Sequence, residues 1–370
     1  MKDSNDEFMF NVAVKAEETD SQLCVTGRAF NQLFSGAVAD ITLIHKKFME
    51  QATVFARTKP NDKAKIVMVY QQMGKKTSMC GDGANDCGAL KQADIGLSLS
   101  QAEASISAPF TSQVANIGSM VELIKECRAG LATNFSLFNI MAIYSLIQST
   151  LSIIEEFYLS YPADLQYLYE DLALNFFLII FVGYTATADR LSVERPRNTL
   201  FSLTNICQIL FMFLVQAGGQ VLSIYIFRWV DGDYYEQHGG FDNNRAYYEE
   251  NEEFRLDGVE GNAIFIFTNN IFLVSVLAFN ISRPWRKEFF TNLPLLLIAA
   301  LVLVFNVLMS LFDWADWSEF ELVHLQKDEV RYFLLLESLC FAAFLYAAQK
   351  CVLEPLTFRL ARKYERKPWI

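Results

Sequence analysis

The chain has 370 residues, of which 52% are hydrophobic and 20% are charged. This apolar share is high for a water-soluble protein and indicates membrane-embedded segments beside folded domains. The formal net charge of −11 gives no support to nucleic-acid binding, which needs a basic surface. The seven cysteines are odd in number, scattered and without metal-ligand spacing, so they predict reduced thiols rather than disulfides or a zinc site.

The segment between residues 20 and 110 is predicted to alternate short strands with helices. Such alternation is typical of a parallel sheet with helices on both faces. Functional loops of such a sheet lie at the carboxyl ends of its strands. Strands are expected at 22–26, 53–56, 77–80 and 94–99, and helices at 30–34, 38–49, 60–74 and 86–92.

Long apolar segments fill the rest of the chain, and each has the length of about 20 residues that is needed to cross a bilayer. The alternative, buried helices of a soluble protein, does not account for so many successive segments of spanning length. The six segments are 136–158, 165–188, 203–229, 262–282, 292–312 and 332–353.

The distribution of basic residues predicts the orientation of these segments, because cytosolic loops are rich in lysine and arginine. The loop 231–261 instead holds ten acidic residues against two arginines. Both chain ends are therefore expected in the cytosol, with this acidic loop on the far side. The basic residues lie after the second and fourth segments and in the tail: Arg190, Arg195, Arg197, Arg283, Arg286, Lys287, Arg359, Arg362, Lys363, Arg366 and Lys367.

Two aspartates lie in a glycine-rich stretch, GDGANDCGALK, directly after a predicted strand. Glycines let the backbone turn sharply and leave Asp82 and Asp86 free to point outward, with Asn85 between them. Carboxylate oxygens are ligands that Mg²⁺ accepts together with phosphate oxygens and water. A lone Asp-Gly pair is usually only a turn, so this stretch needs support from other residues.

That support comes from two upstream elements. Thr26 and Gly27 end the first predicted strand, and Lys63 lies early in a predicted helix. A threonine hydroxyl can donate to a phosphate oxygen, and a lysine can neutralise phosphoryl charge. Lys63 alone would be interpreted as a solvated helix residue, so the order and spacing of the three elements carry the prediction.

Polar residues form stripes on the first two apolar segments. Asp171 lies some six residues into its helix, roughly 9 Å at the helical rise, and a carboxylate deep in lipid costs about 2.5–3.5 kcal/mol. We therefore expect it to face protein, water or a cation, with a structural helix–helix hydrogen bond as the alternative. For Glu155, Glu156 and Asp164, near the helix ends, a solvated position is an equal alternative. The stripes are Tyr144, Gln148, Ser152 and Glu155, and Asp164, Asp171 and Asn175.

A third polar pair lies on the predicted segment 203–229. Gln216 and Gln220 share one helical face near Gly218 and Gly219. Small residues allow helices to approach closely, so we expect a close-packing position there.

The stretch GDGANDCGALK resembles the hinge signature of P-type ATPases, whose phosphorylation domain is haloacid-dehalogenase-like. The following residues, ADIGLSLSQAEASISAPFTS, resemble the B-type branch of the fifth class of these pumps, the polyamine transporters of endosomes and lysosomes. VFARTKPNDKAKIV and CVTGRAF also fit this family. The resemblance implies an α/β, Rossmann-like partial phosphorylation domain over 1–133, an all-α bundle of six transmembrane helices over 134–354, and a basic cytosolic tail over 355–370.

The resemblance also implies roles for residues. Asp82 and Asp86 would hold Mg²⁺, with Asn85 beside them, while Lys63, Thr26 and Gly27 would contact phosphate. In the membrane, Tyr144, Gln148, Asp164 and Asp171 match positions that bind the transported polyamine. Carboxylates and aromatic faces suit ammonium groups, and this half-site would be completed by a helix outside these residues.

The phosphorylated aspartate of such pumps lies in a DKTGT motif, which these 370 residues do not contain. ATP would be bound mainly by domains that are also missing, so we expect the chain alone to be inactive. A membrane-anchored dehalogenase-type phosphatase and a truncated, non-catalytic membrane protein are the alternatives. The first lacks a credible nucleophile near Asp3 or Asp6. Partners are expected to be a polyamine, the bilayer and anionic lipids at the tail, although a solvated tail is nearly as plausible.

Overall fold

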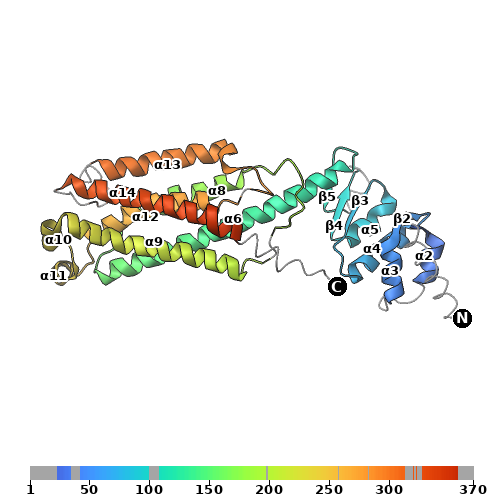
Figure 1. The fold of residues 1–370 in the computed structure, drawn as a ribbon, viewed down its shortest axis with the longest axis horizontal. Coiled ribbons are helices and arrows are strands. Elements are labelled where there is room, and N and C mark those ends of the chain that lie inside the picture. Colours follow the sequence, from blue (N-terminus) through green and yellow to red (C-terminus); the bar gives the residue numbers. More distant parts are fainter. Residues whose placement is uncertain are drawn as a thin grey trace. The chain divides into compact units, whose positions relative to one another are not determined.

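A computed structural model of the chain describes residues 23–34, 42–99, 108–196, 199–256, 258–281, 283–312, 320, 322 and 327–356. The predicted basic tail therefore lies almost wholly outside the described residues. The backbone separates into two compact units, with the division between Ile124 and Lys125. This division falls inside helix α6 (Gly118–Phe157), and each unit is described by itself below (Figure 1).

The first unit contains the four predicted strands and one more. Strands β1 (Leu23–Thr26) and β2 (Ala52–Ala56) pair in parallel, with Thr26 opposite Ala56. Strands β3 (Ser78–Gly81) and β4 (Ile95–Ser98) also pair in parallel. The additional strand β5 (Phe110–Thr111) extends this second sheet and is too short to give a sequence pattern. The expected single sheet is thus two sheets among the described residues, β1-β2 and β3-β4-β5.

The predicted helices of the first unit are confirmed with shifted ends; of the helix predicted at 38–49, residues 38–41 lie outside the described residues and the described part begins at Leu43. Helix α4 begins at Pro60, whose fixed φ suits the first helical turn, and Gly74 follows its end at φ +78°. A hydrophobic core of Val25, Phe30, Met49 and Val69 holds the first sheet against these helices. The helices are α2 (Gly27–Leu33), α3 (Leu43–Gln51), α4 (Pro60–Gln72), the 3₁₀ turn η1 (Ala84–Asp86) and α5 (Cys87–Gln92).

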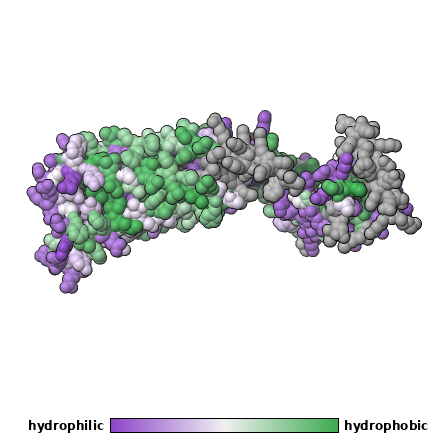
Figure 2. All heavy atoms as spheres, turned by 60° about the horizontal axis from the view of Figure 1, so that its bottom comes forward, coloured by the Kyte–Doolittle hydropathy of each residue, from purple (hydrophilic) through white to green (hydrophobic). Residues whose placement is uncertain are grey.

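The second unit is helical and confirms the predicted spanning segments. Within the described ranges, six helices are long and apolar enough to cross a membrane. Figure 2 shows hydrophobic side chains over the lateral surface of these helices and hydrophilic side chains at the end that carries α10 (Gly232–His238) and α11 (Phe241–Asn251). The spanning elements are α6, the run α7 (Asp164–Tyr169), η2 (Glu170–Phe177) and α8 (Leu178–Gly183), then α9 (Leu203–Val230), α12 (Val259–Phe279), α13 (Leu293–Leu311) and α14 (Asp328–Ala347) with η5 (Ala348–Leu353).

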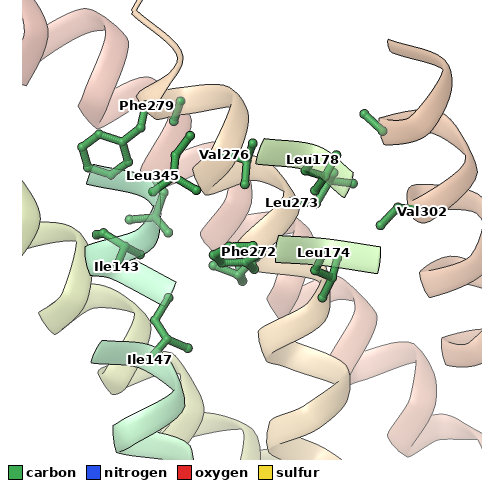
Figure 3. Packing of buried hydrophobic residues seen from close by; sticks show 14 of the residues in the cluster. Ile143, Ile147, Leu174, Leu178, Phe272, Leu273, Val276, Phe279, Val302 and Leu345 are labelled. Carbon is green, nitrogen blue, oxygen red and sulfur yellow. The ribbon is translucent and has the colours of Figure 1, made fainter. Parts of the chain in front are cut away.

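Helix α12 is the central helix of this unit, and 89% of its most hydrophobic stretch is buried inside the protein. Figure 3 shows Phe272 of α12 between Ile143 and Ile147 of α6 on one side and Leu174 of η2 on the other. Nearby Val276 and Leu345 continue the same core. Helices α9, α13 and α14 also pack directly against α12.

Polar side chains on α9 and α13 hydrogen-bond to α12. Gln220 Nε2 donates to Thr268 Oγ1 at 3.1 Å, and Gln216 Nε2 donates to Ser275 Oγ at 2.5 Å. Asn306 Nδ2 of α13 donates to the carbonyl oxygen of Asn269 at 3.0 Å. In an apolar environment such bonds fix the rotation of neighbouring helices, because an unpaired amide would be costly there.

The acidic segment after α9 is folded rather than a plain loop. The buried carboxylate of Glu260, at the start of α12, accepts the backbone N–H of Gly240 at 2.5 Å. The Asn244 side chain donates to the carbonyl oxygen of Tyr158 at 2.9 Å. Helices α10 and α11 are thereby fastened to the ends of α6 and α12.

The close-packing position expected on α9 is confirmed and gives a stability test. A Cβ atom at Gly219 would lie 2.1 Å from the Phe267 ring, whereas a Cβ at Gly218 would meet nothing within 4 Å. We expect Gly219→Ala to lower the free energy of unfolding by about 1–3 kcal/mol through overpacking.

Gly218→Ala is the matched control and should be neutral or slightly stabilising, because alanine is favoured over glycine in helices. Thermal unfolding of both variants in the same detergent measures the difference. Equal melting temperatures would show that the α9–α12 contact is not as close as described.

Candidate functional site

The turn after β3 brings an aspartate and a lysine together. Asp86 is buried at the end of η1, and its Oδ1 lies 2.6 Å from Nζ of Lys63 on α4. Asp82 and Asn85 are exposed in the same turn. Gly81 makes this packing possible, since a Cβ there would lie 2.6 Å from Cβ of Asp86.

Thr26 and Gly27 lie at the end of β1, next to the start of α4. The Thr26 hydroxyl accepts the backbone N–H of Ala29 at 3.4 Å and caps helix α2. A Cβ at Gly27 would lie 2.8 Å from the carbonyl oxygen of Arg57, so only glycine fits there. We call Thr26, Gly27, Lys63, Asp82, Asn85 and Asp86 the strand-end cluster, within which the side-chain contact among the described residues is that of Lys63 with Asp86.

Asp62 is a member of this region that the sequence analysis missed. Its carboxylate accepts a hydrogen bond from the Asn31 side chain and another from the backbone N–H of Lys59, each at 3.0 Å. The hydrogen bond from Asn31, followed by that from Lys59, lowers the pKa of Asp62 below its usual value. The Asn31–Asp62 hydrogen bond links α2 to the first turn of α4, immediately before Lys63. The capping spacing from Lys59 to Asp62 was the signal that could have revealed it.

The strand-end cluster has the donor set of a magnesium and phosphate site. Asp82 offers an exposed carboxylate, and Lys63 supplies a positive charge beside Asp86. Among the described residues no group of three His, Cys, Asp or Glu side chains could hold a metal alone. Mg²⁺ requires only one or two protein carboxylates when phosphate and water complete its octahedron.

In the second unit, the two predicted polar stripes face each other. The Tyr144 hydroxyl of α6 donates to Asp171 Oδ1, and Gln148 Nε2 donates to Glu170 Oε2. Gln148 also donates to the Tyr144 hydroxyl at 3.4 Å. The Tyr144 ring is held by an edge-on contact with Phe272, with ring centroids 5.3 Å apart. We call Tyr144, Gln148, Glu170 and Asp171 the intramembrane cluster.

Glu170 was not among the predicted site residues, and the helix geometry explains why. Glu170 and Asp171 lie in the π-helical segment η2, which has more residues per turn than an α-helix. The α-helical period that predicted the stripe of Asp164, Asp171 and Asn175 leaves the adjacent Glu170 off that stripe. The wider turn brings both towards α6. Such π segments are frequent at functional sites.

The remaining predicted residues are placed differently. Asp164 at the start of α7 is exposed, and the structure shows no contact between it and Tyr144, Gln148 or Asp171 within the described part of the chain. Glu156 is also exposed. Glu155, for which a solvated end was equally open, is instead buried at 1% exposure.

The intramembrane cluster combines two carboxyl groups, a phenol and an amide without a basic partner. Within the described ranges, no lysine or arginine forms an ion pair with Glu170 or Asp171. Acidic groups inside a membrane unit normally pair or line a pathway for cations. Carboxylates and an aromatic ring are the groups that bind ammonium ions.

The chain is similar to known cation-transporting ATPases. The polyamine-transporting ATPase 13A2 of Homo sapiens is 35% identical over 269 residues, which cover 72% of this chain and 21% of the human protein. The vacuolar cation-transporting ATPase YPK9 of Saccharomyces cerevisiae is 30% identical over 315 residues, 80% of this chain and 20% of the yeast protein. The probable cation-transporting ATPase 13A4 of Gallus gallus is 28% identical over 342 residues, 85% of this chain and 28% of its own length. No family model matches the chain.

The glycine at the end of β3 provides a test of the strand-end cluster. Gly81→Ala should displace the Asp86 side chain and break its contact with Lys63, because the added Cβ would lie 2.6 Å from that of Asp86. We expect faster hydrogen–deuterium exchange in the peptide covering residues 78–92 of the purified chain.

Gly83→Ala is the control, since a Cβ at Gly83 meets nothing within 4 Å. Its exchange in the same peptide should stay close to that of the unmodified chain. Equal exchange in both variants would argue against the described turn.

Proposed function

The chain is homologous to the P-type ATPases of the fifth class, B-type, and we propose that it forms the carboxyl-terminal part of an ATP-driven cation pump that transports a polyamine. The relatives above are named as polyamine- or cation-transporting ATPases. The observation that carries the proposal is the contact of Tyr144 and Gln148 with two carboxyl groups inside the helical unit.

In this proposal the strand-end cluster handles phosphate. Lys63 would neutralise a phosphoryl oxygen, and Thr26 with the Gly27 backbone would donate hydrogen bonds to it. Asp82 and Asp86 would hold a Mg²⁺ ion, which supplies positive charge at the phosphate when bound. The Lys63–Asp86 pair at 2.6 Å keeps the lysine oriented while no phosphate is present.

The intramembrane cluster would receive the transported cation. Asp171 is exposed at the surface of this unit, so its carboxylate can accept a ligand from outside the described residues. A polyamine suits the site because its ammonium groups can replace the missing basic partners of Glu170 and Asp171. Asp164 would contribute at the rim of the same site.

In this proposal the chain is one part of a longer pump. The chain spans between 20% and 28% of the length of the relatives given above. We propose that the phosphorylated aspartate and most of the ATP site belong to the rest of the pump, and that both ends of this chain face the cytosol. The six spanning helices and the vacuolar relative support an internal-membrane, multi-pass protein.

Asp171→Asn in the complete pump tests the transport assignment. Removing the charge that Tyr144 contacts should raise the polyamine concentration for half-maximal ATPase stimulation by about tenfold, the loss expected for a charged hydrogen bond. Lys63→Ala serves as the contrast, because it should lower ATP hydrolysis at every polyamine concentration. An unchanged polyamine response in Asp171→Asn would remove Asp171 from the site.

Purification of the 370-residue chain tests the assignment of ATP hydrolysis to the whole pump. We expect no magnesium-dependent, vanadate-sensitive ATP hydrolysis, because DKTGT does not occur in these residues. The complete pump under the same conditions is the positive control. Measurable vanadate-sensitive turnover by the chain alone would contradict the proposal.

A further inference from the structure

Glu155, near the end of α6, is a buried carboxyl group that the proposed function does not yet use. Its side chain is 1% exposed, and neither carboxylate oxygen has a hydrogen-bond partner. No lysine or arginine of the described chain pairs with it. A buried carboxylate without a partner is costly, so this group is either protonated or matched by a cation.

A second buried carboxyl group lies nearby. Glu170 is 2% exposed, and its Oε1 has no partner, while its Oε2 accepts from Gln148. The two glutamates lie within electrostatic range of each other, and Tyr167 lies within range of both. The Tyr167 hydroxyl is 3.3 Å from Ser152 Oγ on α6, which places polar oxygens between the two carboxyl groups.

The neighbouring helix leaves room for this pair. A Cβ atom at Gly261 of α12 would lie 2.8 Å from Glu155 Oε1 and 3.5 Å from Ser160 Oγ. Glycine at this position therefore lets the Glu155 carboxyl group lie against the α12 backbone. The polar oxygens of this group come from α6 and from α7 with η2, and they lie beside α12.

The arrangement favours an elongated organic cation over a metal ion. Tyr144 and Glu155 are eleven positions apart on α6, roughly 16 Å at the helical rise. Acidic groups follow this line in the order Asp171, Glu170, Glu155. Mg²⁺ and Ca²⁺ need six or more oxygens gathered around one point, and no such group of three acidic, His or Cys residues occurs in the described chain.

We propose that Glu155 and Glu170 form a second ammonium-binding station, which extends the intramembrane cluster towards the carboxyl end of α6 and selects for polyamines with more than two amino groups. This inference rests on the proposed function. Asp171 and Tyr144 would bind one ammonium group of the polyamine, and the two glutamates would bind a later one. A diamine can bridge the neighbouring carboxyl groups of Asp171 and Glu170 but is too short to reach Glu155 as well, so its binding would not depend on Glu155.

The experiment uses the complete pump with Glu155→Gln and measures ATPase stimulation by spermine, a tetraamine, and by putrescine, a diamine. Glutamine matches glutamate in size and removes a buried charge, so the fold should persist. An unchanged putrescine response would show that the variant is folded. We expect the half-maximal spermine concentration to rise about tenfold, with less than about a twofold change for putrescine. Glu170→Gln should weaken spermine as well.

Glu156→Gln is the matched control, because Glu156 is the exposed neighbour of Glu155 on the same helix. It should leave both amine responses unchanged. If the wild-type pump responds to spermine and Glu155→Gln responds equally, the second station is overturned and the proposed function stands. A shifted pH optimum with unchanged spermine affinity would also overturn it, since the pair would then carry a proton. A wild-type pump that no amine stimulates would refute the proposed function and this inference together.

Discussion

The enclosure of α12 by protein is the constraint on which the helical unit depends. This helix is buried on all sides and carries asparagine, threonine and serine side chains. Its neighbours therefore have to supply both apolar surface and hydrogen-bond partners. Gln216 and Gln220 of α9 supply partners for Ser275 and Thr268, and Asn306 of α13 donates to the backbone carbonyl oxygen of Asn269. These bonds fix the rotation of α9 and α13 against α12.

The two units hold their buried carboxyl groups in opposite ways. In the first unit, Asp86 is buried but neutralised by Lys63, so the pair is stable without a ligand. In the helical unit, both oxygens of the buried Glu155 and Oε1 of the buried Glu170 have no hydrogen-bond partner among the described residues. The first arrangement is suited to a site that is open to water and occupied only during part of a cycle. The second leaves carboxyl groups without a basic partner, which suits a passage for cations.

Sequence patterns predicted the long elements well, because each spanning helix and each strand carries its own hydrophobic signal. The pairing of Tyr144 with Asp171 was also predictable from helical spacing. Glu170 was missed because η2 departs from the α-helical period, and Asp62 because its role depends on Asn31, a residue far away in sequence. The division into two sheets could not be predicted, since strand neighbours are set by tertiary packing rather than by the strands' own residues.

The absence of a side chain at Gly261 has a consequence for how sequences of this kind can diverge. The space that a methyl group would take is occupied by the carboxyl group of Glu155, so the two positions are not free to vary independently. In a related chain that carries alanine or serine in place of the glycine, the carboxyl group has to move or a shorter residue has to replace the glutamate. Covariation of these two positions, ordinarily interpreted as a packing contact, would in this case also record which transporters have gained or lost an acidic group.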